Sequence, residues 1–539
     1  MTTTVSLRKR LLLGDEAVAL AALDAGIGSA FSYPGTPATE IFETIEEVVS
    51  RTGAFHPQWS ANEKVAYEEA LGMSYAGKRA LVSMKHVGLN VASDPFINSA
   101  LTGVNGGLVL VVADDPGMHS SQNEQDSRFY AEFAHVPCFE PCNQQEAYDA
   151  TLDAFEYSER VGLPVVLRLV TRLSHSRANV TLREISSNGN GHRSRPDPSD
   201  WTLVPANARR RYAQLWGKQA SLLEDSEKSH YNTLHLVGSR GIIASGLAYN
   251  YVREALGDAA SDWSLLKIGM YPLPTGLIRR LVDHCDEILL VEEGFPFIEK
   301  RLLGVLGVPG KSIRGKLSGE LPLTGELTPD TVAAAIFPGR PGAPKLSQPV
   351  SPRPPQLCKG CPHSDTFRAM LEAVTGYAHP VLLGDIGCYT LGVMPPYRAV
   401  HACVDMGASI AMAHGASRAG AHPVLCTIGD STFAHSGMTA LIGAAQSDAN
   451  MTVFILDNAT TAMTGTQDSM TTGKRLLDML AGLGVPQEHL IVLEPLPQRH
   501  AQNVERIKAE IEHPGLSVIV ASRACIHVRR KERAEMVTA

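Results

Sequence analysis

The chain has 539 residues, of which 44% are hydrophobic and 19% charged, and its formal net charge is −8. This length is too great for one ordinary core and predicts several globular units, while the composition argues against a disordered chain. No block of Lys and Arg is long enough for a nucleic-acid footprint, so we expect no nucleic-acid partner. Near the N-terminus, Asp15 and Glu16 interrupt the apolar run, which argues against a signal peptide or membrane span. We expect a cytoplasmic protein with no membrane association.

Apolar runs alternate with helical patterns along the whole chain. Examples are "GLVLVVA" in the first part, "WSLLKIGM" in the middle part and "MTVFILDN" in the third part. This alternation predicts parallel sheets covered by helices. We predict an α/β protein of three doubly wound parallel-sheet modules, over residues 1–185, 230–337 and 357–539. Segments 186–229 and 338–356 are expected to be linkers, because each includes a stretch rich in Gly, Pro and Ser.

The first module has four segments that suggest function. "YPGTPATE", residues 33–40, follows an expected strand, and its Thr36 would cap the helix that begins near Pro37. "SANEKVAYEEALGMSYAG" predicts a helix with Glu63 near its start, where the helix dipole favours an acid. The polar segments 84–90 and 114–128 follow apolar strands, as functional loops often do.

In the third module, Asp430 and Asn458 end two successive expected strands. A right-handed crossover places such strand ends side by side, and a carboxylate with an amide oxygen suits a hard divalent cation. Gly429 would let the backbone approach a ligand closely. The alternative is that Asp430 caps a helix and Asn458 occupies a turn.

The chain has nine cysteines, of which Cys358 and Cys361 form a Cys-x-x-Cys pair. Zinc, thiol redox chemistry and an iron–sulfur cluster all use this spacing. Cys388 and Cys525 follow expected strands and could complete four thiolate ligands for a cluster or for zinc. The alternative for these two is that they are small buried hydrophobic residues. The remaining cysteines are assigned to packing: Cys138, Cys142, Cys285, Cys403 and Cys426.

The segments "YPGTPATE", "DNATTAMTGTQ", "CKGCPH" and "GDIGCYTLG" together resemble the alpha subunits of indolepyruvate ferredoxin oxidoreductases. These belong to the thiamine diphosphate-dependent 2-oxoacid:ferredoxin oxidoreductase superfamily, and the resemblance covers essentially the whole chain. It implies that 1–185 is a thiamine diphosphate pyrimidine-type domain and 357–539 the pyrophosphate and magnesium-binding domain. Residues 230–337 would form a transketolase C-terminal-like domain. The implied cofactors are thiamine diphosphate, Mg²⁺ and one [4Fe-4S] cluster.

The resemblance also implies residue roles. Glu63 would share a proton with the aminopyrimidine ring, with Thr36 and His86 also catalytic, and Lys85, His86 and His119 are carried over as substrate contacts. In such a turn, however, a His is more often a structural hydrogen-bonding residue. The expected cofactor-binding residues are Gly35, Thr36, Glu63, Gly429, Asp430, Ser431, Asn458, Thr460, Met463 and Thr464. The expected metal ligands are Asp430, Asn458 and the Thr460 carbonyl for Mg²⁺, and Cys358, Cys361, Cys388 and Cys525 for the cluster.

The implied activity is oxidative decarboxylation of a 2-oxoacid to an acyl-CoA and CO₂, with electrons passing through the cluster to ferredoxin. The chain departs from the family in having Asp114 and Asp115 where pyruvate-specific relatives carry an Arg, which favours an aryl substrate such as indole-3-pyruvate. We also expect it to lack the family's C-terminal ferredoxin-like extension. We expect a gamma/beta-type partner subunit, ferredoxin and an oligomer. The alternatives are a non-oxidative decarboxylase and a catalytically silent scaffold or electron-transfer subunit.

Overall fold

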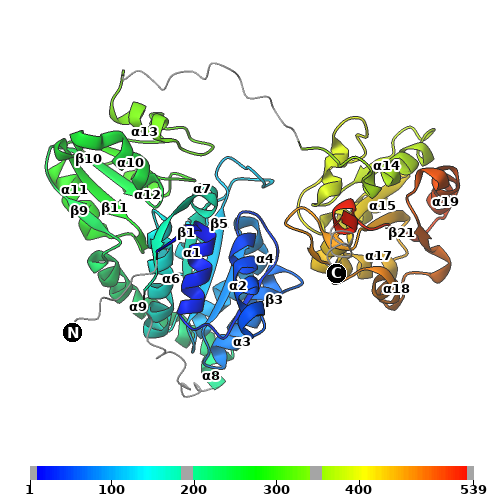
Figure 1. The fold of residues 1–539 in the computed structure, drawn as a ribbon, viewed down its shortest axis with the longest axis horizontal. Coiled ribbons are helices and arrows are strands. Elements are labelled where there is room, and N and C mark those ends of the chain that lie inside the picture. Colours follow the sequence, from blue (N-terminus) through cyan, green and yellow to red (C-terminus); the bar gives the residue numbers. More distant parts are fainter. Residues whose placement is uncertain (1–8, 184–197, 340–354, 531–539) are drawn as a thin grey trace. The chain divides into compact units, whose positions relative to one another are not determined.

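The computed structural model describes residues 9–183, 198–339 and 355–530, which fall into two compact units, Met1–Leu346 and Ser347–Ala539 (Figure 1). The expected modules 1–185 and 230–337 both lie in the first unit. The three main sheets are mostly parallel and carry helices, which confirms the predicted α/β class. Most of the expected linker 338–356 lies outside the described residues.

A seven-stranded sheet forms the centre of the first unit, in the order β12-β6-β7-β5-β4-β2-β3. Its pairs are parallel except for β12, which runs antiparallel to β6. Strands β4, β5 and β7 are apolar almost throughout because helices cover both faces of the sheet. The strands are β2 (Ser29–Ser32), β3 (Gln58–Trp59), β4 (Ala80–Lys85), β5 (Leu108–Asp114), β6 (Cys138–Phe139), β7 (Val165–Val170) and β12 (Met270–Tyr271).

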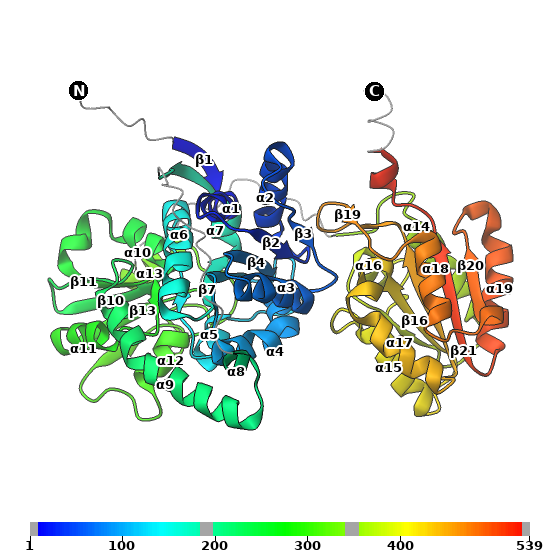
Figure 2. The same cartoon turned by 90° about the horizontal axis from the view of Figure 1, so that it is seen from below.

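Two groups of helices cover this sheet, one on each face (Figure 2). On one face α1 packs against α2 and α6, and on the other α3 packs against α4. Asn62 fixes the start of α3 by accepting a hydrogen bond from the backbone of Val65, so that Glu63 is the first helical residue. The helices are α1 (Gly14–Asp24), α2 (Thr39–Thr52), α3 (Glu63–Tyr75), α4 (His86–Thr102), α5 (Arg128–Phe133), α6 (Gln144–Val161) and α7 (Thr171–His175). Strands β1 (Lys9–Leu13) and β8 (Arg177–Thr181) pair beside them.

The second sheet of this unit has the order β14-β13-β10-β11-β9, and only β9 is antiparallel. Gly269 alone separates β11, in this sheet, from β12, which completes the edge of the first sheet. The same chain segment therefore joins both sheets. The elements are β9 (Thr233–His235), β10 (Arg240–Ser245), β11 (Trp263–Ile268), β13 (Glu287–Val291), β14 (Ser312–Arg314), α10 (Ala248–Leu256), α11 (Thr275–His284), α12 (Phe297–Leu303) and α13 (Pro329–Ile336).

Residues Pro205–Lys228, within the expected linker 186–229, form helix α9 instead. Arg211 donates to the carbonyls of Leu101 and Thr102 at the end of α4, and Lys218 donates to Val161 at the end of α6. Basic side chains at these helix ends satisfy carbonyls that have no partner within their own helix. The helix buries little apolar surface, so its sequence shows weak hydrophobic periodicity.

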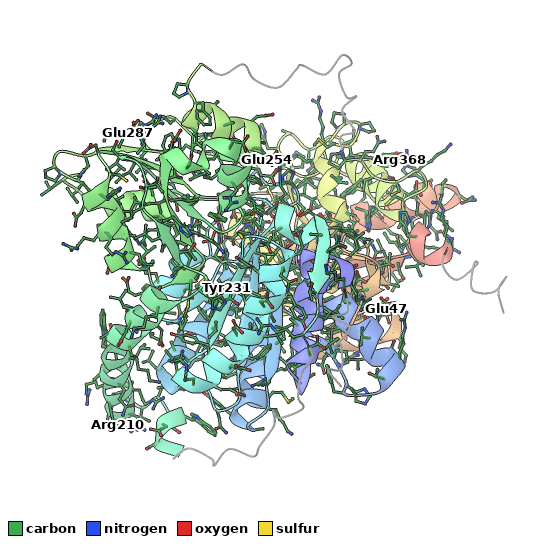
Figure 3. The ribbon with its side chains drawn as sticks, turned by 60° about the vertical axis from the view of Figure 1, so that its left-hand side comes forward. Glu47, Arg210, Tyr231, Glu254, Glu287 and Arg368 are labelled. Carbon is green, nitrogen blue, oxygen red and sulfur yellow. The ribbon has the colours of Figure 1, made fainter. Side chains whose placement is uncertain are left out.

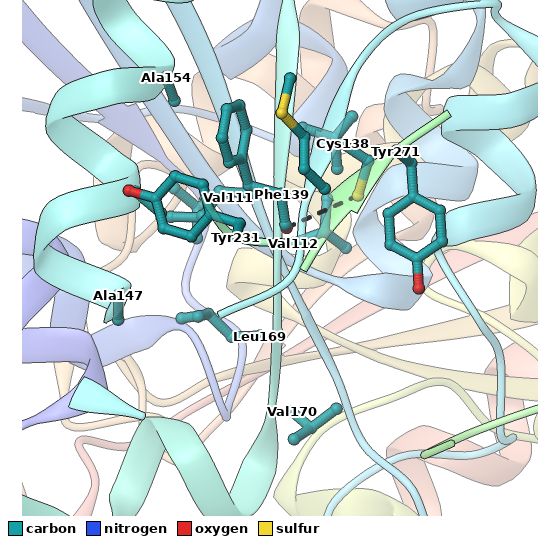
Figure 4. Packing of buried hydrophobic residues seen from close by; sticks show 14 of the residues in the cluster. Val111, Val112, Cys138, Phe139, Ala147, Ala154, Leu169, Val170, Tyr231 and Tyr271 are labelled. Atoms are coloured by element: carbon teal, nitrogen blue, oxygen red, sulfur yellow. Dashed lines mark hydrogen bonds between the residues drawn. The ribbon is translucent and has the colours of Figure 1, made fainter. Parts of the chain in front are cut away.

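Apolar packing and buried charges both hold the two sheets together. Figure 4 shows Tyr231, from the segment before β9, packed edge-on against Phe139 of β6, with ring centroids 5.4 Å apart. Beside them, Arg168 lies 2.6 Å from Asp114 and also pairs with Glu140. Arg128 lies 2.9 Å from Glu292, which follows β13 of the second sheet, and both arginines are almost wholly buried.

A five-stranded, all-parallel sheet forms the second unit, in the order β15-β16-β17-β21-β20. Two hydrophobic clusters flank it. The elements are β15 (Val381–Leu383), β16 (Val424–Gly429), β17 (Met451–Asp457), β20 (Leu490–Leu493), β21 (Leu516–Ser522), α14 (Pro362–Ala373), α15 (Ala408–Arg418), α17 (Met438–Gln446), α18 (Gly473–Gly482) and α19 (His500–Glu512). Strands β18 (Thr460–Thr461) and β19 (Gln467–Asp468) form a separate hairpin.

Charged side chains such as Glu47, Arg210 and Arg368 project from the helix surfaces (Figure 3). Among the helices of the described residues, none combines the length and the apolar character needed to cross a bilayer.

Replacing Arg168 with Met tests the buried charge network. The change leaves Asp114 and Glu140 without their shared cation in a dry environment, so we expect the free energy of unfolding of the first unit to fall by about 3–5 kcal/mol. All four tryptophans, Trp59, Trp201, Trp216 and Trp263, lie in this unit, so tryptophan fluorescence during urea unfolding reports on it alone. Arg51→Met, which removes an exposed pair with Glu47, serves as the control and should cost less than about 1 kcal/mol. An equally small loss for Arg168→Met would contradict the expectation.

Candidate functional site

Strands β16 and β17 bring the two predicted polar residues of the second unit to one edge of the sheet. Gly429 at the end of β16 pairs in register with Leu456 of β17, so Asp430 and Asn458 follow neighbouring strand ends. Asp430 begins the short helix α16 (Asp430–Thr432), and its carbonyl accepts a hydrogen bond from Thr471. Asp430 and Asn458 therefore lie at the same edge of the sheet, as the crossover between parallel strands predicts.

The Asp430 carboxylate is suited to hold a cation. It is buried, and its Oδ2 has no hydrogen-bond partner among the described residues. Burial, together with the nearby charge of Asp457, raises the pKa of Asp430 to about 7. A carboxylate in such a place is costly without a positive partner, and a divalent cation would remove that cost.

The Asn458 loop closes around Asp430. Asn458 Oδ1 accepts a hydrogen bond from the Thr460 backbone at 3.1 Å, and Ala459 between them has a left-handed φ of 64°. Thr461 donates to Ser431 Oγ at 2.9 Å, which ties this loop to the residue after Asp430. Of the other two expected loop residues, Thr464 bonds to Gln467 within the loop, whereas Met463 is exposed in this unit.

Gly429 is needed for a reason that the sequence did not show. A Cβ there would lie 2.8 Å from Cε1 of the Tyr389 ring. Tyr389 and Thr432 both donate to the carbonyl of Ile386, at 2.9 and 3.0 Å, and so hold the "GDIGC" loop against β16. The close approach at Gly429 is therefore to an aromatic ring of the same unit.

The four predicted ligand cysteines lie close enough to influence one another. Burial raises the pKa of Cys361 to about 11, and the thiols of Cys358 and Cys525 add to the shift. Burial likewise raises the pKa of Cys388 to about 12, with contributions from the other three thiols. Cys358 is the exposed member, and its Sγ lies 3.5 Å from Nε2 of His527.

The cysteines are connected directly to the Asn458 loop. The backbone N–H of Cys525 donates to the Asn458 carbonyl at 3.0 Å. His363, two residues after Cys361, places its Nε2 3.3 Å from the Asn458 side-chain nitrogen. Burial lowers the pKa of His363 to about 4, so its ring is neutral and Nε2 can accept a hydrogen bond from the amide. The sequence reasoning missed His363, although it stands inside the quoted "CKGCPH" motif.

In the first unit, Glu63 is buried against Gly88. A Cβ at Gly88 would lie 2.6 Å from Cγ and Oε1 of Glu63, so only glycine leaves room for this carboxyl group. Lys85, at the end of β4, has a pKa that burial lowers and that the charges of Asp115 and Glu63 partly restore. A Cβ at Gly35 would touch the Lys85 stem at 3.2 Å. Gly35, Glu63 and Lys85 therefore lie at one edge of the sheet, where β2 and β4 end.

The other expected residues of this module differ in their surroundings. Thr36 is half-buried, and its carbonyl accepts a hydrogen bond from Ser120 at 3.1 Å. His86 is buried with its Nε2 3.1 Å from the Asn123 carbonyl, while its Nδ1 has no hydrogen-bond partner among the described residues. The His119 side chain is instead exposed and lies 3.5 Å from Glu326.

Asp115 entered the sequence prediction only because it stands where other relatives carry an Arg, and its own contacts were not predicted. Burial would raise its pKa, but hydrogen bonds from Ser120, Ser121 and Thr171 outweigh that effect and lower it. Asp115 therefore stays ionised and fixes the loop that follows β5. The sequence feature that could have indicated Asp115 is the Asp pair in "VVADD". Asp114, the first of the pair, forms an ion pair with Arg168.

Thiol labelling of the metal-free, reduced chain tests the cysteine arrangement. With a pKa of about 11, only about one Cys361 side chain in a thousand is a thiolate at pH 8, so iodoacetamide should label exposed Cys358 first. The labelling rate of Cys361, followed by mass spectrometry, should rise about tenfold per pH unit from pH 8 to 10. Cys426, in the sheet core, is the internal control and should stay unlabelled until the chain unfolds. Equal rates for Cys358 and Cys361 at pH 8 would be inconsistent with this geometry.

Two protein-family profiles match the chain. The family described as "Pyruvate flavodoxin/ferredoxin oxidoreductase, thiamine diP-bdg" matches residues 20–212, which include Glu63. The family described as "Thiamine pyrophosphate enzyme, C-terminal TPP binding domain" matches residues 385–485, which include Asp430 and Asn458. Each unit thus contains a thiamine diphosphate-binding domain.

Relatives match over nearly the whole chain. The indolepyruvate oxidoreductase subunit IorA of Archaeoglobus fulgidus is 39% identical over 97% of this chain and 88% of its own length. The IorA subunit of Pyrococcus abyssi is 39% identical over 96% of this chain and 85% of its own length. A solved structure of 2-oxoglutarate:ferredoxin oxidoreductase from Magnetococcus marinus, with 2-oxoglutarate, coenzyme A and succinyl-CoA bound, shares the fold. Its TM-score is 0.50 at 16% identity, over 61% of this chain and 64% of that one.

These matches confirm the resemblance first seen in the short motifs. The chain belongs to the family of indolepyruvate oxidoreductase IorA subunits, which are thiamine diphosphate-dependent 2-oxoacid:ferredoxin oxidoreductases.

Proposed function

We propose that the chain catalyses oxidative decarboxylation of an aryl 2-oxoacid of the indole-3-pyruvate type. The 2-oxoacid and coenzyme A give the acyl-CoA and CO₂, and two electrons pass through a [4Fe-4S] cluster to ferredoxin. The observation that carries the proposal is the connection between the cysteine set and the Asn458 loop in the second unit, through the backbone of Cys525 and the ring of His363. An electron acceptor held by those cysteines would adjoin a diphosphate held by that loop.

Asp430, Asn458 and the Thr460 carbonyl are the proposed ligands of Mg²⁺, which would bridge to the cofactor's diphosphate. The unpartnered Oδ2 of Asp430 and the oxygen-only donor set fit this cation. When bound, thiamine diphosphate supplies an electron sink for loss of CO₂. Ser431, Met463 and Thr464 are proposed to contact the cofactor from the same loops.

Glu63 is the proposed proton carrier at the aminopyrimidine ring of the cofactor. Its burial at the first residue of α3 and its close fit against Gly88 hold the carboxyl group in one place, as proton transfer requires. Gly35 and Thr36 are proposed to contact the cofactor beside Glu63. Lys85 and His86 would contact the substrate; the exposed side chain of His119, beside Glu326, gives that residue weaker support in this role.

An iron–sulfur cluster fits the four cysteines better than zinc does. Zinc holds thiolates at about 2.3 Å in a tetrahedron, which brings the sulfurs to about 3.8 Å from one another. Among the described residues, the sets of three or more donors that lie within 4.8 Å of one another do not include these cysteines. A cluster spreads its four ligands around a larger core and can pass electrons singly.

The aryl substrate is proposed because β5 ends at Asp114 and is followed by Asp115, where pyruvate-specific relatives carry an Arg. Asp115 is held ionised there, and the nearby Arg168 is buried in its pairs with Asp114 and Glu140. The IorA relatives are named for indolepyruvate. A partner subunit, ferredoxin and an oligomeric assembly are part of the proposal.

Anaerobic dye reduction tests this function directly. The chain is purified with its partner subunit, thiamine diphosphate and Mg²⁺, and supplied with indole-3-pyruvate, phenylpyruvate, pyruvate or 2-oxoglutarate, each with and without coenzyme A. We expect the two aryl oxoacids to reduce methyl viologen in a CoA-dependent way, with kcat/KM at least about tenfold above that for pyruvate. If no oxoacid reduces the dye while iron and thiamine diphosphate are both present, the proposal fails. Aldehyde release without dye reduction would instead indicate a non-oxidative decarboxylase.

Gly88→Ala tests whether activity depends on the position of the Glu63 carboxyl group, without changing Glu63 itself. The added Cβ would displace the carboxyl group, so we expect dye reduction to fall at least about 100-fold, as for Glu63→Gln. Gly72→Ala, in helix α3, is the matched control because a Cβ there meets nothing within 4 Å. It should keep full activity and gain up to about 1 kcal/mol of stability from helix propensity. Circular dichroism checks that all three variants fold, and activity above half in Gly88→Ala would refute the assignment.

A further inference from the structure

Three side chains from separate helices of the first unit converge on one point. Asp15 lies in the first turn of α1, Glu40 in the first turn of α2, and His175 at the end of α7. One oxygen or nitrogen from each lies within 4.8 Å of the others. None of the three has a role in the reaction proposed above.

Asp15 makes this group unusual. Its side chain is 0% exposed, and neither carboxyl oxygen has a hydrogen-bond partner among the described residues. The hydroxyl of Ser174, its polar neighbour, likewise makes no hydrogen bond of acceptable geometry. A buried carboxylate left without donors is strongly disfavoured, so this arrangement calls for a cation or a proton.

Glu40 and His175 complete the surroundings but do not satisfy each other fully. His175 Nε2 is 3.5 Å from Glu40 Oε2, which is longer than a hydrogen bond, and that oxygen has no other hydrogen-bond partner in the described residues. Their side chains are 35% and 36% exposed, so an ion could enter past them and keep a water ligand.

The backbone is built to bring these groups together. A Cβ at Gly14 would lie 2.2 Å from the Leu173 carbonyl, so glycine is required where α1 meets α7. This contact sets Asp15 beside Ser174 and His175. On the other side, the Gly35 backbone donates to Thr39 Oγ1 at 3.0 Å, which fixes the start of α2 and the position of Glu40.

We propose that Asp15, Glu40 and His175 bind a divalent transition-metal ion of the Zn²⁺ type. Two carboxylates balance the charge of the ion, and an imidazole nitrogen with carboxylate oxygens is a donor set that such ions accept. The bound ion links α1, α2 and α7. It thereby holds the turn at Thr36, which directly precedes α2.

Zinc titration of the full chain, followed by isothermal calorimetry, tests the site. Because added zinc could also be taken up by free cysteine thiols, the readout is the difference between wild type and variants that leave the cysteines intact. We expect Asp15→Asn and His175→Gln each to lose one zinc equivalent, or to bind it at least about tenfold more weakly. Glu16→Gln is the matched control: its carboxylate neighbours Asp15 in sequence but accepts from the Leu13 backbone, so zinc binding should be unchanged.

Anomalous diffraction from zinc-soaked crystals then locates the ion. A peak bounded by the three donor atoms supports the proposal. Equal zinc binding by wild type and both site variants, with no peak at this point, overturns it and leaves Asp15 as a buried protonated acid. His175→Gln changes a partly exposed side chain, so the test does not depend on whether Asp15→Asn folds.

Discussion

Two buried guanidinium groups dictate how the first unit is assembled. Arg128 and Arg168 have lost their water, so each must be surrounded by carboxylates and carbonyls, and both sheets contribute these groups. Glu292 comes from the second sheet, as does the Glu293 carbonyl, 3.0 Å from Arg128. Because Asp114 is committed to Arg168, Asp115 is left to accept bonds from the loop that follows β5. The charge network at the end of β5 therefore lies beside the polar edge that carries Glu63 and Lys85, and the charge of Asp115 acts on the pKa of Lys85.

In the second unit the controlling constraint is the parallel sheet. Asp430, the Asn458 loop and Cys525 all follow the ends of neighbouring strands of this sheet. A few hydrogen bonds connect them. Glycine at position 429 and the Tyr389 ring then fix the loop that carries Cys388. Residues distant in sequence thus depend on the same backbone geometry. A change in this loop would therefore affect both the proposed oxygen ligands of the cation and the thiols.

Much of this arrangement could be predicted because it follows from local rules. Asn62 as a cap places Glu63 at a helix start, and the crossover between parallel strands places Asp430 beside Asn458. Helix α9 was missed because its main partners are carbonyls at other helix ends, which leave no periodic pattern. The Asp15, Glu40 and His175 group carries no motif, since tertiary packing alone brings its members together. The contact between Glu63 and Gly88 could not be predicted either, because it depends on how α3 packs against α4.

The strand order has a consequence for synthesis on the ribosome. Strand β6 acquires its outer neighbour only when Met270 and Tyr271 have been made, about 100 residues after β7 is complete. At about 5–20 residues per second, the nascent first sheet waits roughly 5–20 s with that edge open. Arg128 must also remain hydrated until Glu292, one of its carboxylate partners, has been synthesised. An N-terminal fragment that ends before residue 270 is therefore a poor autonomous folding unit, and the two sheets reach their final form together.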